Sequence, residues 1–273
     1  MVIYITGASG YLGNAFVEYF VEQGHKVVAL SRKNVFDHPG IQFFHYSLGK
    51  KLDTVRPKPD VCIHCAYDLK ATKWKEIYNV NVLGSEALFE QLSKLGCKTI
   101  VHISSLSAFD GCRSKYGRAK LLIEEIAGKY KGISIRPGLI HGGNNSGLIG
   151  KLKKIAQYPV IPMIGNGNYP QFLTDIDRLC QLIHEIVMAK YVVSSNVITL
   201  SSLKSVTLRE IVRKINSRAI IIPLYWKIPY LLLNFMEALN IDLPLKADSI
   251  SGLVFSNETP DFRFIHENKI VFE

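Results

Sequence analysis

The chain has 273 residues, of which 48% are hydrophobic and 21% are charged. This composition is that of a globular protein and excludes a disordered, collagen-like or coiled-coil chain. The 33 basic residues outnumber the 23 acidic ones, and the net charge of +10 favours an anionic partner such as a phosphate group, a nucleic acid or a membrane surface.

Apolar runs of strand length alternate with stretches of helical period along the first half of the chain. The predicted strands lie at 2–5, 26–30, 41–45, 61–65, 99–104 and 132–136, and the predicted helices at 11–23, 72–95 and 114–127. Each strand is expected to be buried on both faces, and each helix is followed by a glycine suited to a helix C-cap. This alternation predicts an α/β Rossmann fold, a doubly wound parallel sheet that binds ligands at the carboxyl ends of its strands.

Beyond about residue 140 the pattern loosens into Gly, Asn, Pro and Lys. Further elements are predicted there, including a helix opened by the capping box of Thr207 and Glu210. We expect residues 1–140 to form a dinucleotide-binding domain and residues 141–273 to form mainly a smaller C-terminal α/β substrate-binding lobe. Part of 175–205 is expected to return to the main sheet.

The most apolar stretch, 219–239, is interrupted by two prolines and a lysine, so it lacks the ~18 uninterrupted apolar residues of a membrane-spanning helix. The favoured interpretation is a buried strand over 219–222 followed by an amphipathic helix. In that helix Leu231, Leu232 and Phe235 would pack inward, with Lys227 and Asn234 on the wetter side. Contact with a membrane surface is the alternative.

The compartment is predicted from the cysteines and the N-terminus. The five cysteines are odd in number and scattered through a chain larger than disulfide-stabilised domains, which favours a reducing environment. The first strand has no preceding basic region or cleavage site of a secretory signal. We therefore expect a cytoplasmic protein.

A glycine-rich turn follows the first strand and opens the first helix. Gly7 permits the tight turn, Gly10 lets the backbone approach a pyrophosphate, and Gly13 lets the helix pack against the strand. Free amide groups at the helix N-terminus then hold the phosphates. The predicted phosphate-binding residues are Gly7, Ser9, Gly10, Tyr11, Leu12 and Gly13.

The second strand is followed by Ser31, Arg32 and Lys33. NAD-specific sheets place a carboxylate here for the ribose hydroxyl, whereas an arginine accepts the 2′-phosphate of NADP. The sequence therefore favours NADP, with NAD possible. The alternative is that Arg32 and Lys33 only solvate the end of the strand.

Tyr116 and Lys120 are four residues apart in a predicted helix and so share one face. An ammonium near a phenol favours the phenolate and would lower the tyrosine pKa toward the working pH, making Tyr116 an acid or base. The preceding strand ends at Ser104 and Ser105, where a hydroxyl can hold a substrate oxygen. Each feature alone is unspecific, but together with the glycine turn they form a specific combination.

With these motifs the sequence resembles the extended short-chain dehydrogenase/reductases, the NAD(P)-dependent nucleotide-sugar epimerase/dehydratase/reductase family. The resemblance runs over nearly the whole chain. Its motifs are Thr6-Gly7-x-x-Gly10-x-x-Gly13, 59–66, Asn81-Val82-x-Gly84-Ser85, Ser104-Ser105, Tyr116-x-x-x-Lys120 and Arg136-Pro137-Gly138.

The resemblance implies roles for several residues. Tyr116 would exchange a proton with a sugar hydroxyl or ketone, Lys120 would also hold the nicotinamide ribose, and Ser105, rather than Ser104, would bind the reacting oxygen. Further cofactor contacts are expected at His64, Ala66, Asn81 and Pro137.

The implied function is that of a sugar 4-epimerase or keto-sugar reductase that transfers hydride to or from a nucleotide-activated sugar. The segments 222–233 and 249–253 resemble the substrate lobe of surface-polysaccharide epimerases, which implies a role in the synthesis of polysaccharide precursors. Partners expected are the nucleotide sugar and a second copy in a homodimer. The alternative is a non-catalytic NADP-binding sensor or assembly protein.

Three departures from the family pattern concern substrate and cofactor binding. The segment between Ser105 and Tyr116 is short, and Ser47 stands where an adenine-contacting Asp is typical. Where many epimerases carry an arginine for the substrate pyrophosphate, this chain has Pro170-Gln171-Phe172. Substrate binding is therefore expected to differ in detail.

Two other signals are assigned to structure. Cys62 and Cys65 are three apart in a strand and so point to opposite faces, and no second cysteine or histidine pair completes a metal site. His64 is expected near the cofactor rather than on a metal. The basic runs lack interleaved aromatics, so no nucleic-acid partner is expected.

Overall fold

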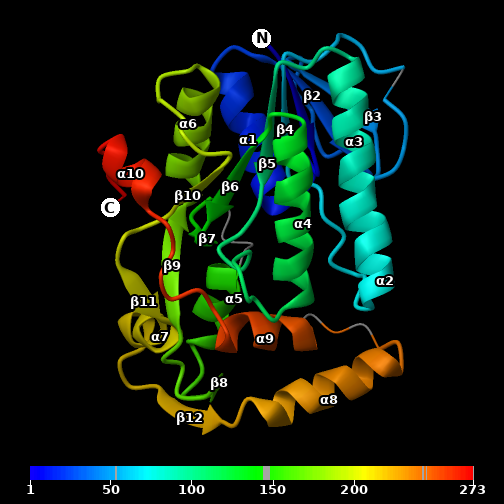
Figure 1. Ribbon diagram of the computed structural model, residues 1–273. Coiled ribbons are helices and arrows are strands. Elements are labelled where there is room, and N and C mark those ends of the chain that lie inside the picture. Colours follow the sequence, from blue (N-terminus) through cyan, green and yellow to red (C-terminus); the bar gives the residue numbers. More distant parts are fainter. Residues whose placement is uncertain (53, 144–147, 242, 244, 273) are drawn as a thin grey trace.

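The computed structural model of the chain describes residues 1–52, 54–143, 148–241, 243 and 245–272. A central parallel sheet occupies one end of the molecule, and two small sheets and several helices occupy the other (Figure 1). None of the helices in these ranges is both long and apolar enough to cross a membrane.

The central sheet has seven strands in the order β10-β6-β5-β4-β1-β2-β3, and every neighbouring pair is parallel. The doubly wound α/β fold expected from the alternating pattern is thereby confirmed. Its strands are β1 (Val2–Thr6), β2 (Lys26–Ser31), β3 (Ile41–His45), β4 (Val61–His64), β5 (Thr99–Ile103), β6 (Ile133–Pro137) and β10 (Val197–Leu200).

Helices cover both faces of this sheet. On one face α1 (Tyr11–Glu22), α6 (Ile176–Val187) and α10 (Arg263–Glu267) pack on side chains such as Ile3 and Ile5. On the other, α3 (Leu83–Lys94) and α4 (Lys115–Lys129) pack on Tyr4 and Leu30. Alternate residues of one strand therefore enter different cores, as the two-residue period of a strand requires.

Two expectations about these elements are wrong in detail. β3 is an edge strand whose Gln42 and His45 are exposed, so it is not buried on both faces. The helix predicted over 72–95 is divided into α2 (Trp74–Ile77), a π-helical turn η1 (Tyr78–Val82) and α3. The π turn holds the buried Asn81, whose amide is tied to the loop after β4 rather than facing solvent.

The remaining elements lie beyond the carboxyl ends of the strands. One small sheet contains β7 (Leu139–His141), β9 (Pro170–Asp175) and β11 (Ser205–Thr207), and the other pairs β8 (Val160–Ile164) with β12 (Ile220–Leu224). The helices here are α5 (Leu148–Ile155), α7 (Leu208–Ile215), α8 (Lys227–Ala238) and α9 (Ala247–Val254). The capping box of Thr207 and Glu210 at the start of α7 is confirmed.

The orientation predicted for α8 is wrong. Leu231, Leu232 and Phe235 are 64%, 58% and 64% exposed, whereas Leu233 is the side chain that is buried. The strand before it is also only partly covered, since Ile220 and Ile222 are exposed. Trp226, Tyr230 and Leu233 form the inner face of α8. The helix therefore has two apolar faces, and a period of 3.6 residues does not say which of them turns inward.

Candidate active site

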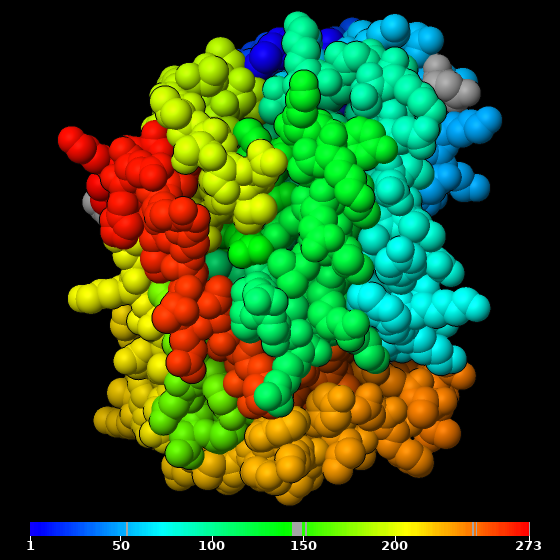
Figure 2. Space-filling view, in the orientation of Figure 1, coloured from blue at the N-terminus to red at the C-terminus, as the bar shows by residue number. Residues whose placement is uncertain are grey.

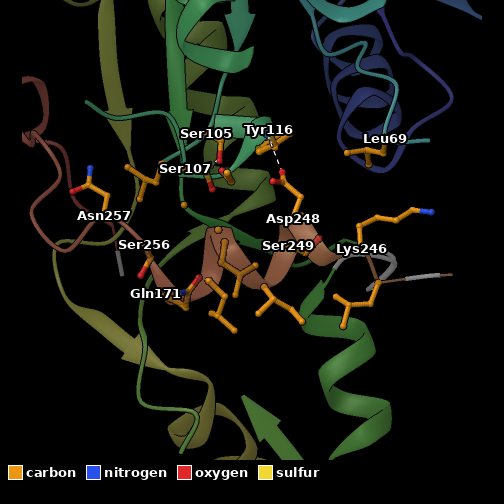
Figure 3. Close-up of a pocket in the computed structure, with 18 of the residues that line it drawn as sticks. Leu69, Ser105, Ser107, Tyr116, Gln171, Lys246, Asp248, Ser249, Ser256 and Asn257 are labelled. Carbon is orange, nitrogen blue, oxygen red and sulfur yellow. Dashed lines mark hydrogen bonds between the residues drawn. The ribbon is translucent and has the colours of Figure 1, made fainter. Parts of the chain in front are cut away.

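A cavity of about 630 Å³ lies between the carboxyl ends of β5 and β6 and the helix α9. Ser105 and Tyr116 contribute to its wall from the sheet side, and Gln171 and Asp248 from the other (Figure 3). Pro137, at the end of β6, also lines it. It is the place where catalytic groups of a parallel α/β sheet are expected to gather.

Ser105 and Tyr116 meet in this cavity. Ser105 is two residues beyond the end of β5, and Tyr116 lies in the first turn of α4. Both line the cavity, and the Ser105 side chain favours the phenolate of Tyr116. The approach depends on Gly117, because a Cβ there would lie 2.1 Å from the Ser107 carbonyl oxygen. Ser114 caps the helix by accepting a hydrogen bond from the Gly117 amide. The start of α4 is thus pressed against the turn that carries Ser105.

Ser104 is engaged elsewhere. It is buried, and its hydroxyl donates a hydrogen bond to Glu124. That carboxylate also accepts two hydrogen bonds from the Arg136 guanidinium, at 2.8 and 2.6 Å. The geometry therefore supports the choice of Ser105 as the hydroxyl available to a substrate.

Lys120 is 4% exposed and lies beneath Tyr116 on the same helix. Its ammonium donates a hydrogen bond to the Ile103 carbonyl at 2.6 Å and lies 5.1 and 5.9 Å from the ring centres of Tyr67 and Tyr116. Burial lowers its pKa to about 8, because desolvation penalises the charged form.

The expectation that Lys120 brings the tyrosine pKa toward neutrality is wrong for this structure. The pKa of Tyr116 is raised to about 12, because burial disfavours the phenolate more than the neighbouring Ser105 side chain favours it. Tyr116 is therefore a protonated phenol at neutral pH, in the form that gives a proton.

A buried hydrogen-bond chain runs behind the cavity. Nδ1 of His64 is 2.7 Å from the Thr6 hydroxyl, and Nε2 is 2.9 Å from the Ser85 hydroxyl, which itself donates to the Asn81 carbonyl. Burial lowers the His64 pKa to about 3, so the ring is neutral. Because Ser85 donates onward, the arrangement assigns the ring proton to Nε2.

The backbone of the glycine-rich turn has the shape that a pyrophosphate site needs. Gly7 has φ +66°, and a Cβ there would meet the Ala66 backbone at 2.9 Å. A Cβ on Gly13 would lie 2.2 Å from the Gly7 carbonyl oxygen, so Gly13 lets the helix pack closely against the turn that follows β1. Gly10 is the N-cap of α1 and has no side chain with which to cap it, which leaves the helix N-terminus able to bind an anion.

The other residues predicted to bind the cofactor surround this turn. Ser9 and Gly10 are exposed, Leu12 is partly buried, and the Tyr11 hydroxyl donates to the Gly142 carbonyl at 2.8 Å. The Ala66 amide donates to the Thr6 hydroxyl. Ser31 is buried and donates to the Lys33 carbonyl, while the side chains of Arg32 and Lys33 are exposed at the end of β2. The donor set and the glycine cradle therefore fit a dinucleotide.

Asp248 is a site residue that the sequence reasoning missed. It lies in the first turn of α9, and its two carboxylate oxygens accept hydrogen bonds from the Lys115 and Tyr116 amides at 2.8 and 2.9 Å. Nothing in the sequence signals this contact, because it joins residues more than 130 positions apart. It ties the substrate side of the cavity to the helix that carries Tyr116.

Cys62, in β4, and Cys65, the residue directly after β4, lie in different cores. Cys62 belongs to the one beneath α3 and α4, and Cys65 packs against the one beneath α1 and α6. The expectation that they point to opposite faces is confirmed.

Comparison with known proteins identifies a family and several related dehydrogenases and reductases. The model of the NAD dependent epimerase/dehydratase family matches residues 3–187. The ceramide reductase of Caulobacter vibrioides is 28% identical over 172 residues, covering 60% of this chain and 54% of that protein. The decarboxylating sterol-4-alpha-carboxylate 3-dehydrogenase of Mus musculus is 31% identical over 121 residues, covering 43% of this chain and 33% of that protein. The chain thus spans about half or less of these relatives' length.

The fold has solved counterparts. The structure of UDP-glucose 4-epimerase from Thermotoga maritima with UDP-glucose has a TM-score of 0.69 at 17% identity, covering 82% of this chain and 86% of that chain. At that identity the likeness shows the fold alone.

Replacing Asp248 is predicted to loosen the start of α4. Asp248→Ala removes the acceptor of two amide hydrogen bonds and should lower the free energy of unfolding by about 1–2 kcal/mol, the usual effect of losing a helix cap. Urea unfolding measures the change. Ser249→Ala, at the exposed neighbouring position, is the matched control and should stay within about 0.5 kcal/mol of wild type. Equal stability of the two variants would contradict the capping role.

Proposed function

The chain belongs to the NAD dependent epimerase/dehydratase family, and from this premise we propose that it interconverts a secondary alcohol and a ketone with NADP as the preferred cofactor. The observation that carries the proposal is the placement of Ser105 and Tyr116 together in the wall of the cavity, with the buried Lys120 on the same helix as Tyr116. This arrangement supports an enzyme over the alternative of a non-catalytic NADP-binding protein.

Each residue of the site would have a separate role in the reaction. When bound, a nicotinamide dinucleotide supplies or accepts the hydride at the carbon being reduced or oxidised. Ser105 would hold the reacting oxygen, and the Tyr116 hydroxyl would give it a proton during reduction and take one during oxidation. Lys120 would stabilise the negative charge that then develops on the phenol oxygen.

The rest of the cofactor is assigned to the glycine turn and the end of β2. Residues 7–13 would hold the pyrophosphate against the N-terminus of α1. Arg32 and Lys33 would face the 2′-phosphate of NADP, and Lys120 would reach the nicotinamide ribose. His64, Ala66, Asn81 and Pro137 would complete the binding site, with Asn81 acting through the loop that its amide holds.

The substrate class has two candidates. The nucleotide-activated sugar of an epimerase or reductase in polysaccharide precursor synthesis stays a prediction, and the fold shared with a UDP-glucose 4-epimerase supports it. Relatives named for a ceramide and a sterol carboxylate show that lipid substrates also occur among similar proteins. The cavity lining includes many apolar side chains, such as Leu106, Leu139, Phe172, Ile250 and Leu253, which favours the second class.

Tyr116→Phe is predicted to lower turnover by ~10²–10⁴ on any substrate that the wild type converts, because the proton donor is lost. Dinucleotide binding and the unfolding free energy should be unchanged, since the ring remains. Single-turnover assays and cofactor titration separate the two effects. Full activity in the variant would remove Tyr116 from the mechanism.

The rate of ketone reduction is predicted to fall as the pH rises through about 8. There Lys120 loses its proton, because burial has lowered its pKa to about 8. Above that pH the rate should fall ~tenfold per unit, as the charged fraction does. Lys120→Arg, which stays charged, should abolish the fall wherever it retains activity. A rate that is level in the wild type up to about pH 10 would contradict the role.

Arg32→Ala is predicted to weaken NADPH binding by about tenfold, the lower end of what a charge-assisted hydrogen bond contributes, because the side chain is exposed. NADH binding should stay nearly unchanged. Fluorescence titration of both cofactors measures this, and Lys33→Ala serves as the control with a smaller loss. Equal affinities of the wild type for both cofactors would show that Arg32 does not read the 2′-phosphate.

A further inference from the structure

The helix α8 and the strand β12 present a continuous apolar surface to solvent. The six side chains that define it, called here the α8–β12 face, are 45–65% exposed: Ile222, Tyr225, Ile228, Leu231, Leu232 and Phe235. Figure 2 shows α8, in orange, along the lower rim of the molecule. A contiguous apolar surface of this kind marks a site of interaction rather than ordinary solvent-exposed structure.

The exposed apolar side chains form a regular stripe along α8 and are not isolated residues that the fold leaves uncovered. Ile228, Leu231, Leu232 and Phe235 follow each other at spacings of three, one and three, which places them on one side of the helix. The opposite side of α8 is already packed, with Leu233 9% exposed in a cluster with Ala247 and Ile250. The outer stripe is therefore additional to what the fold needs.

Basic and aromatic side chains accompany the face. Lys227 begins α8, and its ammonium lies 5.9 and 5.8 Å from the ring centres of Tyr225 and Trp226. Arg218 is exposed just before β12, and α7 has Arg213 and Lys214 in its last turn. Tyrosine and lysine beside an aliphatic stripe are typical of helices that lie in a bilayer interface, where the ammonium reaches anionic headgroups.

Apolar side chains also lie at the opening of the cavity. Leu69 and Leu245 both line the cavity, yet they are 69% and 46% exposed, so the opening has apolar edges. Glu237, on the inner side of α8, also lines the cavity and accepts a hydrogen bond from the Ala247 amide. The helix thus separates the cavity from the α8–β12 face.

The described lining of the cavity has few positively charged groups that could bind a diphosphate. Among the described residues that line the cavity, Lys246 is the one basic residue, whereas Asp248 and Glu237 are acidic. Gln171, in the stretch where the family pattern places an arginine, is neutral and lies in the wall (Figure 3). An opening with apolar edges and a wall of this kind suits a molecule delivered from an apolar phase.

We propose that the α8–β12 face docks on an anionic lipid bilayer, so that the cavity opens at the bilayer surface. The six apolar side chains would enter the boundary between headgroups and acyl chains, and the basic residues would contact the headgroups. With a net charge of +10, the protein is attracted to such a surface before contact. The orientation of the cavity rests on the proposed function, whereas the docking itself does not.

Sedimentation with lipid vesicles tests the docking. Wild-type protein should sediment with vesicles of phosphatidylcholine and phosphatidylglycerol, and less with phosphatidylcholine alone or at high salt. Leu232→Glu combined with Phe235→Glu should lower the partition coefficient by about tenfold or more, because two inserted apolar side chains become charged.

A control with the same net charge is available elsewhere on the surface. Val192 and Val271 are 79% and 65% exposed, and neither belongs to the α8–β12 face. The double variant with Val192→Glu and Val271→Glu should bind vesicles with a partition coefficient within about twofold of that of the wild type. The small expected decrease comes from the two added negative charges. Unfolding curves of both double variants confirm that they are folded.

Three results would overturn the proposal. Wild-type protein could stay in the supernatant with anionic vesicles, or the two double variants could lose binding equally. Light scattering could instead show a dimer that the Leu232→Glu and Phe235→Glu variant dissociates, which would make the face a subunit interface. Tyr116→Phe should bind vesicles like the wild type, so a failure of the proposed chemistry is distinguished from a failure of docking.

Discussion

The buried ammonium of Lys120 is the constraint on which the arrangement of the site depends. A charge removed from water needs compensating dipoles, and Lys120 obtains them from the Ile103 carbonyl at the end of β5. This bond fixes the face of α4 relative to the sheet and so determines where Tyr116 stands. The neighbouring His64 and His102 are both neutral, because burial lowers their pKa and the ammonium adds to that effect.

The site is held from two sides. On the sheet side, Gly117 allows α4 to touch the turn after β5, and Ser104, Glu124 and Arg136 join β5, α4 and β6. On the substrate side, Asp248 of α9 binds the amides at the start of α4. A movement of α9 would therefore displace the backbone at Tyr116. In this way the position of the cavity wall is coupled to the position of the proton-transferring group.

The cavity and α8 share a composition that differs from that of a polar sugar site. Apolar side chains line much of the wall, and an apolar stripe covers the outside of the helix that bounds it. Because an exposed stripe costs free energy in water, its presence is easiest to understand if another phase covers it. The same catalytic chemistry on one fold can then serve very different substrates through changes in the lobe alone.

The sequence alone determined the α/β fold and most of the central sheet, because buried strands, amphipathic helices and C-cap glycines are local signals. It also determined the glycine turn and the pairing of Tyr116 with Lys120, since both follow from spacing within one element. The tertiary structure alone decided that Asp248 holds α4, because that contact joins distant segments. It also decided that the phenol of Tyr116 has a raised pKa, since burial depends on every surrounding element. The direction of the α8 stripe was decided in the same way, because periodicity defines a face of a helix but not what the face meets.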